Sequence, residues 1–338
     1  FTLALATDGR VYSWGYGSEG QLGQGDDSDR STPTLIEALR DEGHVTAIAV
    51  GDDHALAVTD EGGLFSWGYG IDGRLGHLLP EGRLLPERVE ALRGVRVVAV
   101  AAARWHSLAL TESGILYSWG GGGFGRLGHG NEENLDLPAP IEALRGERIA
   151  AMAAGAHHSL ALSEGGVAYS WGYGGRGRLG HGDLVNRVYP VRIDALVEVR
   201  LVAVIAGYHH SLAISEGGGL FAWGNGVGGR LGLGDERARL VPERVEGLSH
   251  VRVVAAAAGE GHGIAVTDNG DAYGWGSDAG GWGSDSGSDG GSDAEEPSAA
   301  LPPQGQLTPR LYEGFRCACG PSSGRDSAAL NSAAIDAT

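Results

Sequence analysis

Histidine is the residue whose type and spacing in this sequence first suggest chemistry, because its side chain can bind metals and transfer protons near neutral pH. One histidine recurs about every 52 residues along most of the chain. The positions are His54, His106, His158, His210 and His262. A metal site needs several ligands around one ion, and no second ligand recurs at a fixed distance from these histidines. We therefore interpret them as buried structural residues with hydrogen bonds to backbone, and predict no metal and no cofactor.

Arginine recurs as well, in a Gly-rich segment immediately before Leu-Gly. The positions are Arg74, Arg126, Arg178 and Arg230, with Gln21 in the first repeat. These arginines could form a basic ring on one face, or they could pair with local aspartates and brace the segment, which is the interpretation we favour. The Gly-rich segments lack the strand–Gly–helix order of a phosphate-binding loop. No nucleophile–base–acid set or acidic pair stands out at a single place, so we predict no catalytic residue and no enzymatic activity.

Cysteine content and charge exclude further classes of function. Cys317 and Cys319 are the two cysteines, and two thiolates cannot complete a four-ligand zinc site. So few cysteines are typical of a reducing compartment, and we expect an intracellular protein, cytoplasmic or nuclear. The formal net charge is −18, and this acidity argues against nucleic-acid binding by the body of the domain. No apolar run reaches the length of a membrane span.

The elements that position these residues belong to a repeat. The sequence Ser-Trp-Gly and its close variants return at the same interval as the histidines, thirteen residues later. The tryptophans are Trp14, Trp67, Trp119, Trp171, Trp223 and Trp275. A proline follows most of these tryptophans after nineteen residues, as Pro138 follows Trp119. A period this regular indicates a repeat architecture in which each unit is one supersecondary structure.

One unit contains four short strands and no amphipathic helix. In the third unit we predict strands over Val95–Ala103, Trp105–Leu110, Ile115–Trp119 and Pro138–Leu144, the last at an edge because proline lacks the ladder N–H. Four short strands with tight turns in about 52 residues are typical of a propeller blade. The repeated tryptophans are expected to pack between blades.

The units divide the chain into regions. They cover residues 1–39, 45–92, 95–144, 148–196, 199–248 and 251–315, and the propeller repeats run without interruption over 1–276. Residues 277–306 are rich in Gly, Ser and Asp, and we predict a disordered acidic insertion. Residues 307–315 match a returning propeller strand, and 316–338 are predicted to be a degenerate or disordered tail. Because the chain begins at Phe1, without Met and inside a repeat, we expect a fragment.

The motifs resemble those of the regulator of chromosome condensation family. The resemblance rests on His-Ser-Leu-Ala-Leu from His106, Tyr-Ser-Trp-Gly from Tyr117, Gly-Arg-Leu-Gly-His-Gly from Gly125, and Pro-x-x-Ile-Glu-Ala-Leu from Pro138, at fixed spacing. The family has a seven-bladed β-propeller. The resemblance therefore implies an all-β fold, with about six of seven four-stranded blades present in this chain.

The resemblance implies three alternative functions. The first is a non-enzymatic scaffold for protein–protein interaction, as in the propellers of larger HECT-type ubiquitin ligases, in which any catalytic domain lies outside the propeller. The second is guanine-nucleotide exchange on a Ran-like small GTPase, which the family attributes to a wedge inserted in a blade; units two to five have no additional length for it. The third is ultraviolet sensing, which uses tryptophans repeated across blades, whereas here only Arg104-Trp105-His106 is similar.

Under the scaffold interpretation, other proteins are the partners, and the loops that vary between repeats are the contact surface. The candidate residues are Asp26, Asp29, Arg83, Glu132, Glu133, Asp183, Arg187, Arg237 and Arg239.

Overall fold

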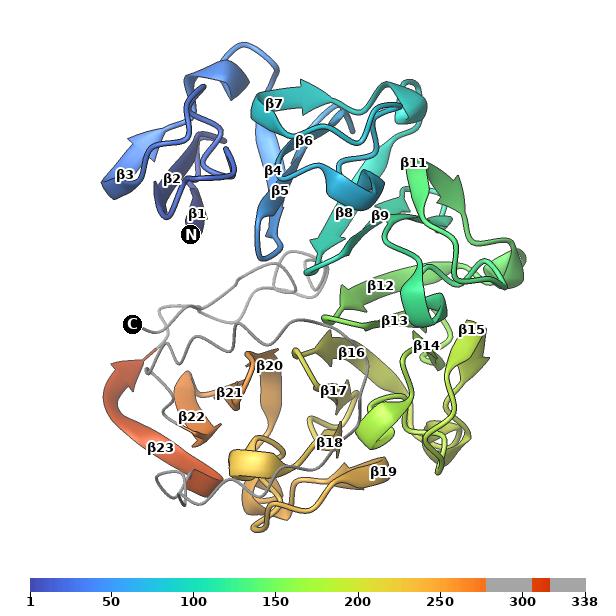
Figure 1. The fold of residues 1–338 in the computed structure, drawn as a ribbon. Coiled ribbons are helices and arrows are strands. Elements are labelled where there is room, and N and C mark those ends of the chain that lie inside the picture. Colours follow the sequence, from blue (N-terminus) through green and yellow to red (C-terminus); the bar gives the residue numbers. More distant parts are fainter. Residues whose placement is uncertain (278–305, 317–338) are drawn as a thin grey trace, which may run out of the picture.

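The computed structural model describes residues 1–277 and 306–316, and their regular elements are β-strands and short 3-10 helices. The strands form six antiparallel sheets that follow one another around a centre as the blades of a propeller (Figure 1). The predicted all-β propeller with about six blades is therefore confirmed. Most of the predicted acidic insertion and of the predicted tail lies outside the described residues.

Blade one has three strands, and each of blades two to six has four. Blade one contains β1 (Thr2–Leu5), β2 (Val11–Gly15) and β3 (Arg30–Leu35). Blade two contains β4 (Val45–Val50), β5 (His54–Thr59), β6 (Leu64–Gly68) and β7 (Arg83–Arg88). Blade three contains β8 (Val97–Ala102), β9 (His106–Thr111), β10 (Leu116–Gly120) and β11 (Leu135–Pro140). Blade four contains β12 (Ile149–Ala154), β13 (His158–Ser163), β14 (Ala168–Gly172) and β15 (Arg187–Arg192). Blade five contains β16 (Leu201–Ala206), β17 (His210–Ser215), β18 (Leu220–Gly224) and β19 (Arg239–Arg244). Blade six contains β20 (Val253–Ala258), β21 (His262–Thr267), β22 (Asp271–Gly276) and β23 (Gln306–Arg316).

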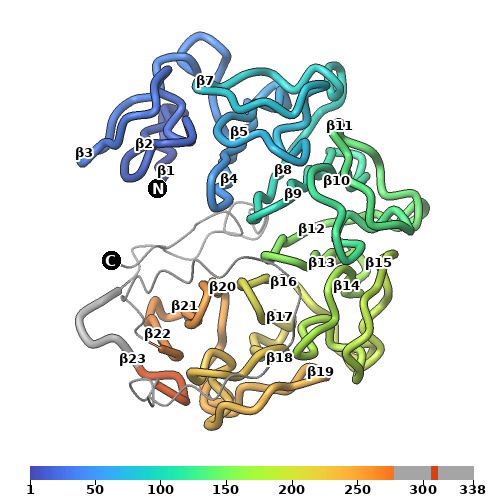
Figure 2. The backbone as a smooth tube through the Cα atoms, viewed as in Figure 1, coloured from blue at the N-terminus to red at the C-terminus, as the bar shows by residue number. Residues whose placement is uncertain are grey.

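The strands of a blade pair in sequence order, and the first strands of neighbouring four-stranded blades contact each other near the centre (Figure 2). The third strand of a blade leads into a 3-10 helix. These helices are η2 (Ile71–Gly73), η4 (Gly123–Gly125), η6 (Gly175–Gly177) and η8 (Val227–Gly229). A second set follows the last strand of blades one to five: η1 (Glu37–Leu39), η3 (Glu90–Leu92), η5 (Glu142–Leu144), η7 (Asp194–Leu196) and η9 (Glu246–Leu248).

The fourth strand of blade three differs from the sequence prediction. The strand was expected over 138–144, but β11 begins at Leu135 and ends at Pro140, and Glu142–Leu144 is a 3-10 helix. The reason is burial: the chain turns after β11, and Ile141 and Leu144 then point into the core between blades three and four. A strand that continued through Leu144 would place successive side chains on opposite faces.

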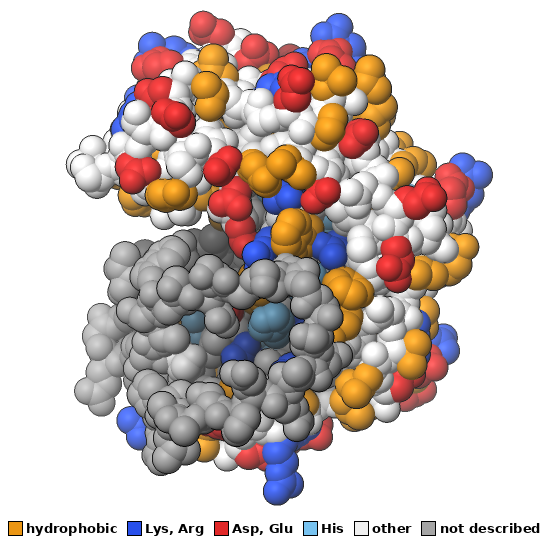
Figure 3. All heavy atoms as spheres, in the orientation of Figure 1, with side chains coloured by type: hydrophobic (Ala, Val, Ile, Leu, Met, Phe, Trp, Pro, Cys, Tyr) orange, Lys and Arg blue, Asp and Glu red, His pale blue; other side chains and the backbone are white. Residues whose placement is uncertain are grey.

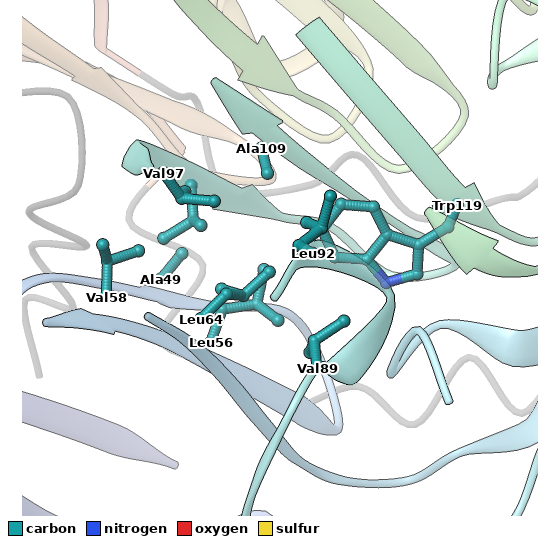
Figure 4. Packing of buried hydrophobic residues seen from close by; sticks show 10 residues of the cluster. Ala49, Leu56, Val58, Leu64, Val89, Leu92, Val97, Ala109 and Trp119 are labelled. Atoms are coloured by element: carbon teal, nitrogen blue, oxygen red, sulfur yellow. The ribbon is translucent and has the colours of Figure 1, made fainter. Parts of the chain in front are cut away.

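The hydrophobic core lies between blades. The cluster shown in Figure 4 joins Leu56, Leu64 and Leu92 of blade two to Val97 and Trp119 of blade three. The repeated tryptophans at 67, 119, 171 and 223 are fully buried in such clusters, and Trp275 is nearly so. Trp14 is half-buried, because blade one is the first blade and no described blade precedes it to cover this ring.

A backbone carbonyl joins each pair of neighbouring blades. The carbonyl oxygen of Arg74 in blade two accepts a hydrogen bond from Trp119 Nε1 (2.9 Å) and another from Ser107 Oγ (2.8 Å), both in blade three. Ser107 Oγ also lies 2.9 Å from Nε2 of His54 in blade two. Since the hydroxyl proton goes to the carbonyl, we assign the Nε2 proton to His54 as donor to serine. We call this arrangement the inter-blade clamp.

The clamp repeats where the sequence supplies its parts. His106 pairs with Ser159 at 2.8 Å, and His158 pairs with Ser211 at 2.9 Å. In blade six, Gly263 replaces the serine, and Nε2 of buried His210 has no hydrogen-bond partner among the described residues. The clamp is incomplete at two further junctions: Phe1 and Ala55 replace the histidine and the serine between blades one and two, and Nε1 of Trp171 has no acceptor among the described residues between blades three and four.

A second histidine set supports each blade internally. Ser66, Ser118 and Ser170 each donate to a leucine carbonyl of the following loop at 2.7 Å. The same hydroxyls lie 2.8 to 3.0 Å from Nε2 of His77, His129 and His181. In blade five, Ala222 and Leu233 replace the serine and the histidine together. The paired replacement removes donor and acceptor at once, so neither is left buried and unsatisfied.

We predict that Trp171→Ala lowers the free energy of unfolding by about 3–5 kcal/mol, because it removes a large, fully buried side chain between two blades. Chemical denaturation monitored by circular dichroism measures this. Tyr16→Ala is the control, since Tyr16 is largely exposed, and should change stability by less than about 0.5 kcal/mol. Equal losses for the two variants would contradict the packing role of Trp171.

We also predict that stability falls as the pH drops below about 6.5. Burial lowers the pKa of His54 and of His210 from 6.5 to about 3, and the pKa values of His106 and His158 also lie well below 6.5. At pH values between the folded and the unfolded pKa, the unfolded chain binds more protons than the folded chain. The stability that each neutral histidine contributes is therefore complete above the unfolded pKa and is lost as the pH falls toward the folded pKa. Each histidine adds a slope of up to about 1.4 kcal/mol per pH unit.

The measurement is urea unfolding between pH 7 and pH 5, a range in which most carboxyl groups remain ionised in the unfolded chain. His158→Gln removes one titrating group and should reduce the pH slope of the unfolding free energy relative to the parent. An unchanged slope would show that His158 is not held neutral in the folded state.

Candidate interaction face

Two sets of residues converge at one end of the blades, around the centre of the ring. The first set comes immediately before each repeated histidine, as Arg104 and Trp105 do before β9. The second set lies in the 3-10 helices that follow the third strands, as Phe124 does in η4. Figure 3 shows basic and histidine side chains close to the centre of the ring on the face in view. We call the following residues the arginine–aromatic cluster: Tyr69, Arg74, Arg104, Trp105, Phe124, Arg126, His157, Tyr173, Arg176, Arg178, Tyr208, His209 and Arg230.

Trp105 lies among three guanidinium groups. Their carbon atoms are 4.9 Å (Arg104), 5.1 Å (Arg74) and 5.9 Å (Arg126) from the centre of its ring. At these distances the negative face of the indole ring attracts each cation. The indole Nε1 is buried and has no acceptor among the described residues. Trp105 is therefore held by arginines and retains one unused N–H donor.

Arg104 connects blades that are not neighbours in the ring. Its Nη1 donates a hydrogen bond to the hydroxyl of Tyr208 in blade five, and its Nε lies 3.7 Å from a carboxylate oxygen of Asp52 in blade two. The pKa of Asp52 is raised mainly by burial, and the positive charge of Arg104 opposes that shift. Arg104 thus ties three blades together at the centre of the face.

The aromatic residues continue over blades three to five. The ring of Phe124 lies 4.7 Å from the ring of Tyr173 and 5.7 Å, edge-on, from that of His157. Tyr208 and His209 are in edge contact at 4.6 Å. Arg178 lies over the ring of Tyr173 at 4.7 Å. Most of this half of the face therefore consists of rings and cations.

The repeated arginines brace their loops, and they also line this face. The Nε atoms of Arg74, Arg126, Arg178 and Arg230 each donate to the carbonyl three residues earlier, at 2.8 to 3.0 Å. Nη1 of Arg74 continues to the carbonyl of Arg104, and Nη1 of Arg230 to that of Glu260. The bracing thus runs mainly through backbone carbonyls, and an ion pair with a local aspartate accompanies it at Arg74, which lies 3.6 Å from Asp72.

The face is electrostatically uneven. Near blade two, burial lowers the pKa of Arg74, and Asp72, Asp53 and Asp52 oppose that shift. In blade four, burial lowers the pKa of Arg178 to about 10, and the next contributions come from Tyr173, Arg176 and Arg230, none of them acidic. Burial and the surrounding arginines also hold the pKa values of His157 and His209 near 3, so both are neutral at pH 7.

The candidate loop residues predicted from the sequence lie farther from the centre, and many of them contact their own loop. Asp26 pairs with Arg30, Asp183 with Arg187, and Asp235 with Arg239, at 2.7 to 2.9 Å. Asp29 accepts a hydrogen bond from the amide of Gly17, and Arg83 pairs with Glu87. Glu132, Glu133 and Arg237 are exposed. The arginine–aromatic cluster was not predicted, although one sequence signal marks it: the residues before each constant histidine change type from blade to blade.

Other kinds of site find little support. Within residues 1–277 and 306–316, no three His, Cys, Asp or Glu side chains are grouped closely enough to hold a metal ion. Cys317 and Cys319 lie outside the described residues. No described helix has the length and apolarity needed to cross a membrane.

The repeat and the propeller match one family of known proteins. A family model described as the RCC1-like domain matches residues 1–320. The chain belongs to the RCC1-like domain family. The resemblance noted in the sequence is thus confirmed.

This RCC1-like domain is similar to proteins of different function. It is 38% identical over 277 residues to the ultraviolet-B receptor UVR8 of Arabidopsis thaliana, which covers 81% of this chain and 62% of the receptor. It is 39% identical over 280 residues to the human E3 ubiquitin-protein ligase HERC2, which covers 81% of this chain and 6% of the ligase. The structure of Prp20p from Saccharomyces cerevisiae has a TM-score of 0.76 and 25% identity, covering 93% of this chain and 76% of Prp20p. The chain thus spans about three fifths of the receptor and a small part of the ligase.

The face of this RCC1-like domain does not repeat tryptophan across its blades. Trp105 occupies the position before the repeated histidine in blade three. The equivalent residues in the other four-stranded blades are Asp53, His157, His209 and Gly261. Trp105 is thus one member of a mixed cluster, which does not favour the ultraviolet-sensing alternative.

We predict that two equivalent arginines differ in their effect on stability. Arg74→Gln should lower the free energy of unfolding by about 1–3 kcal/mol, because it leaves the carbonyl of Arg104 without its donor and removes the ion pair with Asp72. Arg178→Gln should change it by less than about 1 kcal/mol, because it removes a buried cation that no described carboxylate neutralises. Thermal and urea denaturation of both variants provide the comparison, and a larger loss for Arg178→Gln would contradict it.

Proposed function

We propose that this chain is a non-enzymatic interaction domain, and that it binds a protein partner through the arginine–aromatic cluster. The observation that carries the proposal is the composition of the cluster. Trp, Tyr and Arg are the residues that contribute most to protein–protein binding energy, and here they meet at the centre of one face. The surrounding clamps hold the cluster on a rigid scaffold.

The internal comparison of the blades supports the same conclusion. The clamp histidine is the same in blades two to six and the clamp serine in blades three to five, whereas the residues beside them on the face differ. A position that packs the scaffold has the same task in every blade, but a position that touches a partner meets a different part of that partner in each blade. Rigid frames with variable surface residues are a common arrangement for recognition.

The relatives are compatible with a binding role in proteins of different overall activity. HERC2 is a ubiquitin ligase of which the matched region is a small part, and Prp20p is described with binding properties to Gsp1p and histones. We propose protein partners on this basis, and an intracellular location, cytoplasmic or nuclear. The variable outer loops, including Glu132, Glu133 and Arg237, are proposed as a second contact surface.

The test compares a cluster variant with an outer-loop variant. Proteins retained by the immobilised parent domain are identified by mass spectrometry, and the affinity of the purified partner is then measured. We expect Trp105→Ala to weaken binding at least tenfold with a change in Tm below about 4 °C, since the side chain is half-buried and outside the inter-blade cores. Glu132→Ala combined with Glu133→Ala should change affinity less.

Two outcomes would redirect the assignment. If Trp105→Ala bound every partner as the parent does, the outer loops would replace the cluster as the proposed surface. Guanine-nucleotide exchange is the alternative that the family resemblance implies, and it has its own measurement. Accelerated release of a fluorescent guanine nucleotide from a Ran-like GTPase, lost in Trp105→Ala, would assign exchange in place of a pure binding role.

A further inference from the structure

The inference rests on the proposed function and concerns the chemistry of the partner. Arg178 is the starting point, because its side chain is 2% exposed and forms no ion pair with a described carboxylate. Its Nε donates to the carbonyl of Gly175, but its buried Nη1 has no acceptor among the described residues. In the equivalent arginines of blades two and five, Nη1 reaches a carbonyl of the next blade. A buried guanidinium with an unused donor is costly unless an anion completes it.

Arg176 adds a second positive charge at the same place. It lies in η6 with φ of 59°, a left-handed conformation that disfavours residues with a Cβ, and the equivalent residue in blade five is Gly228 with φ of 69°. Its charge acts on Arg178 and on Arg230. Asp72 and Phe124 hold the same conformation in the equivalent helices of blades two and three, so the fold accepts a side chain at this position, and among these helices η6 is the one that places a positive charge there.

The equivalent place in blade two has the opposite chemistry. Asp72 occupies the position of Arg176 and lies 3.6 Å from the guanidinium of Arg74, with Asp52 and Asp53 close by. Glu260 in blade six lies near Arg230. Arg176 and Arg178 thus carry positive charge that no described carboxylate pairs with, and acidic groups lie in blades two and six.

We propose that Arg176 and Arg178 bind the carboxylate of an aspartate or glutamate in an acidic peptide segment of the partner. A guanidinium matches a carboxylate with two parallel hydrogen bonds, and Nη1 of Arg178 is a buried donor for one of them. The ring of Tyr173 lies against Arg178, and the neutral ring of His209 lies near it. A nucleic acid or an anionic membrane would bring many negative charges against a chain of formal net charge −18, which favours a short acidic peptide as the ligand.

The experiment uses a defined probe and three single variants of the full chain. The probe is an end-blocked, fluorescein-labelled (Glu-Gly)4 peptide, compared with (Gln-Gly)4 and with (phosphoserine-Gly)4 by fluorescence anisotropy. The variants are Arg176→Gly, Arg178→Gln and Arg145→Gln. Arg145 serves as the control for net charge, because it is exposed and pairs with Glu142 at 3.0 Å.

We expect the Glu peptide to bind at least tenfold more tightly than the Gln peptide. Arg176→Gly and Arg178→Gln should each weaken the Glu peptide at least fivefold, and Arg145→Gln less than twofold. Arg176→Gly should not lower Tm, because it relieves the left-handed residue, so a loss of binding cannot be attributed to unfolding.

Several results would overturn the inference. The Glu and Gln peptides could bind with equal affinity, or the phosphoserine peptide alone could bind. The three arginine variants could weaken binding of the Glu peptide equally. Sedimentation velocity could also show that the variants self-associate, which would account for the loss of peptide binding. These failures are separate from failure of the proposed function. Partner binding that is lost in Trp105→Ala but kept in Arg176→Gly and Arg178→Gln would preserve the interaction face and reject the carboxylate site.

Discussion

The main-chain carbonyl that follows each 3-10 helix of the Gly-rich loop is the acceptor on which the arrangement of blades depends. The carbonyl oxygen of Arg74 accepts hydrogen bonds from Trp119 and Ser107 of the next blade. Ser107 in turn accepts a hydrogen bond from His54, which lies in the same blade as Arg74. Because these groups are buried, their hydrogen bonds to one another replace the bonds that water cannot supply. The same atoms that satisfy the loop therefore also fix the distance and rotation between neighbouring blades.

This clamp separates the scaffold from the surface. It uses the backbone of the arginine and leaves the guanidinium free to extend toward the centre of the ring, where it meets residues that precede the repeated histidines. A change on the face, such as Asp53 in blade two against Trp105 in blade three, does not alter the atoms that hold the blades together. The residues of the face can thus vary from blade to blade while the frame stays constant, and one fold can host different functions.

The face departs from low-energy choices in blade four. Arg178 is buried without a described carboxylate, and Arg176 holds a left-handed conformation that glycine would adopt more easily. Both features raise the free energy of the isolated domain, and Arg178 lies beside the ring of Tyr173 rather than in an inter-blade core. Local departures from the stablest arrangement are commonly concentrated where a protein binds something else, because the bound group supplies what the fold does not.

The sequence by itself determined the architecture. The regular return of Ser-Trp-Gly and of His106 with its counterparts specifies one blade per period, since an identical side chain at an identical place must have the same neighbours in each unit. It could not locate the end of β11, where burial of Ile141 and Leu144 turns the chain earlier than the strand pattern indicated. It also left the arginines between two interpretations. Only the tertiary structure decided that Arg104 reaches Tyr208. It also decided that the aspartates near Arg74 have no counterpart near Arg178 among the described residues. These contacts join residues that are far apart along the chain, and the closing of the blades around a centre, rather than any local pattern, brings them together.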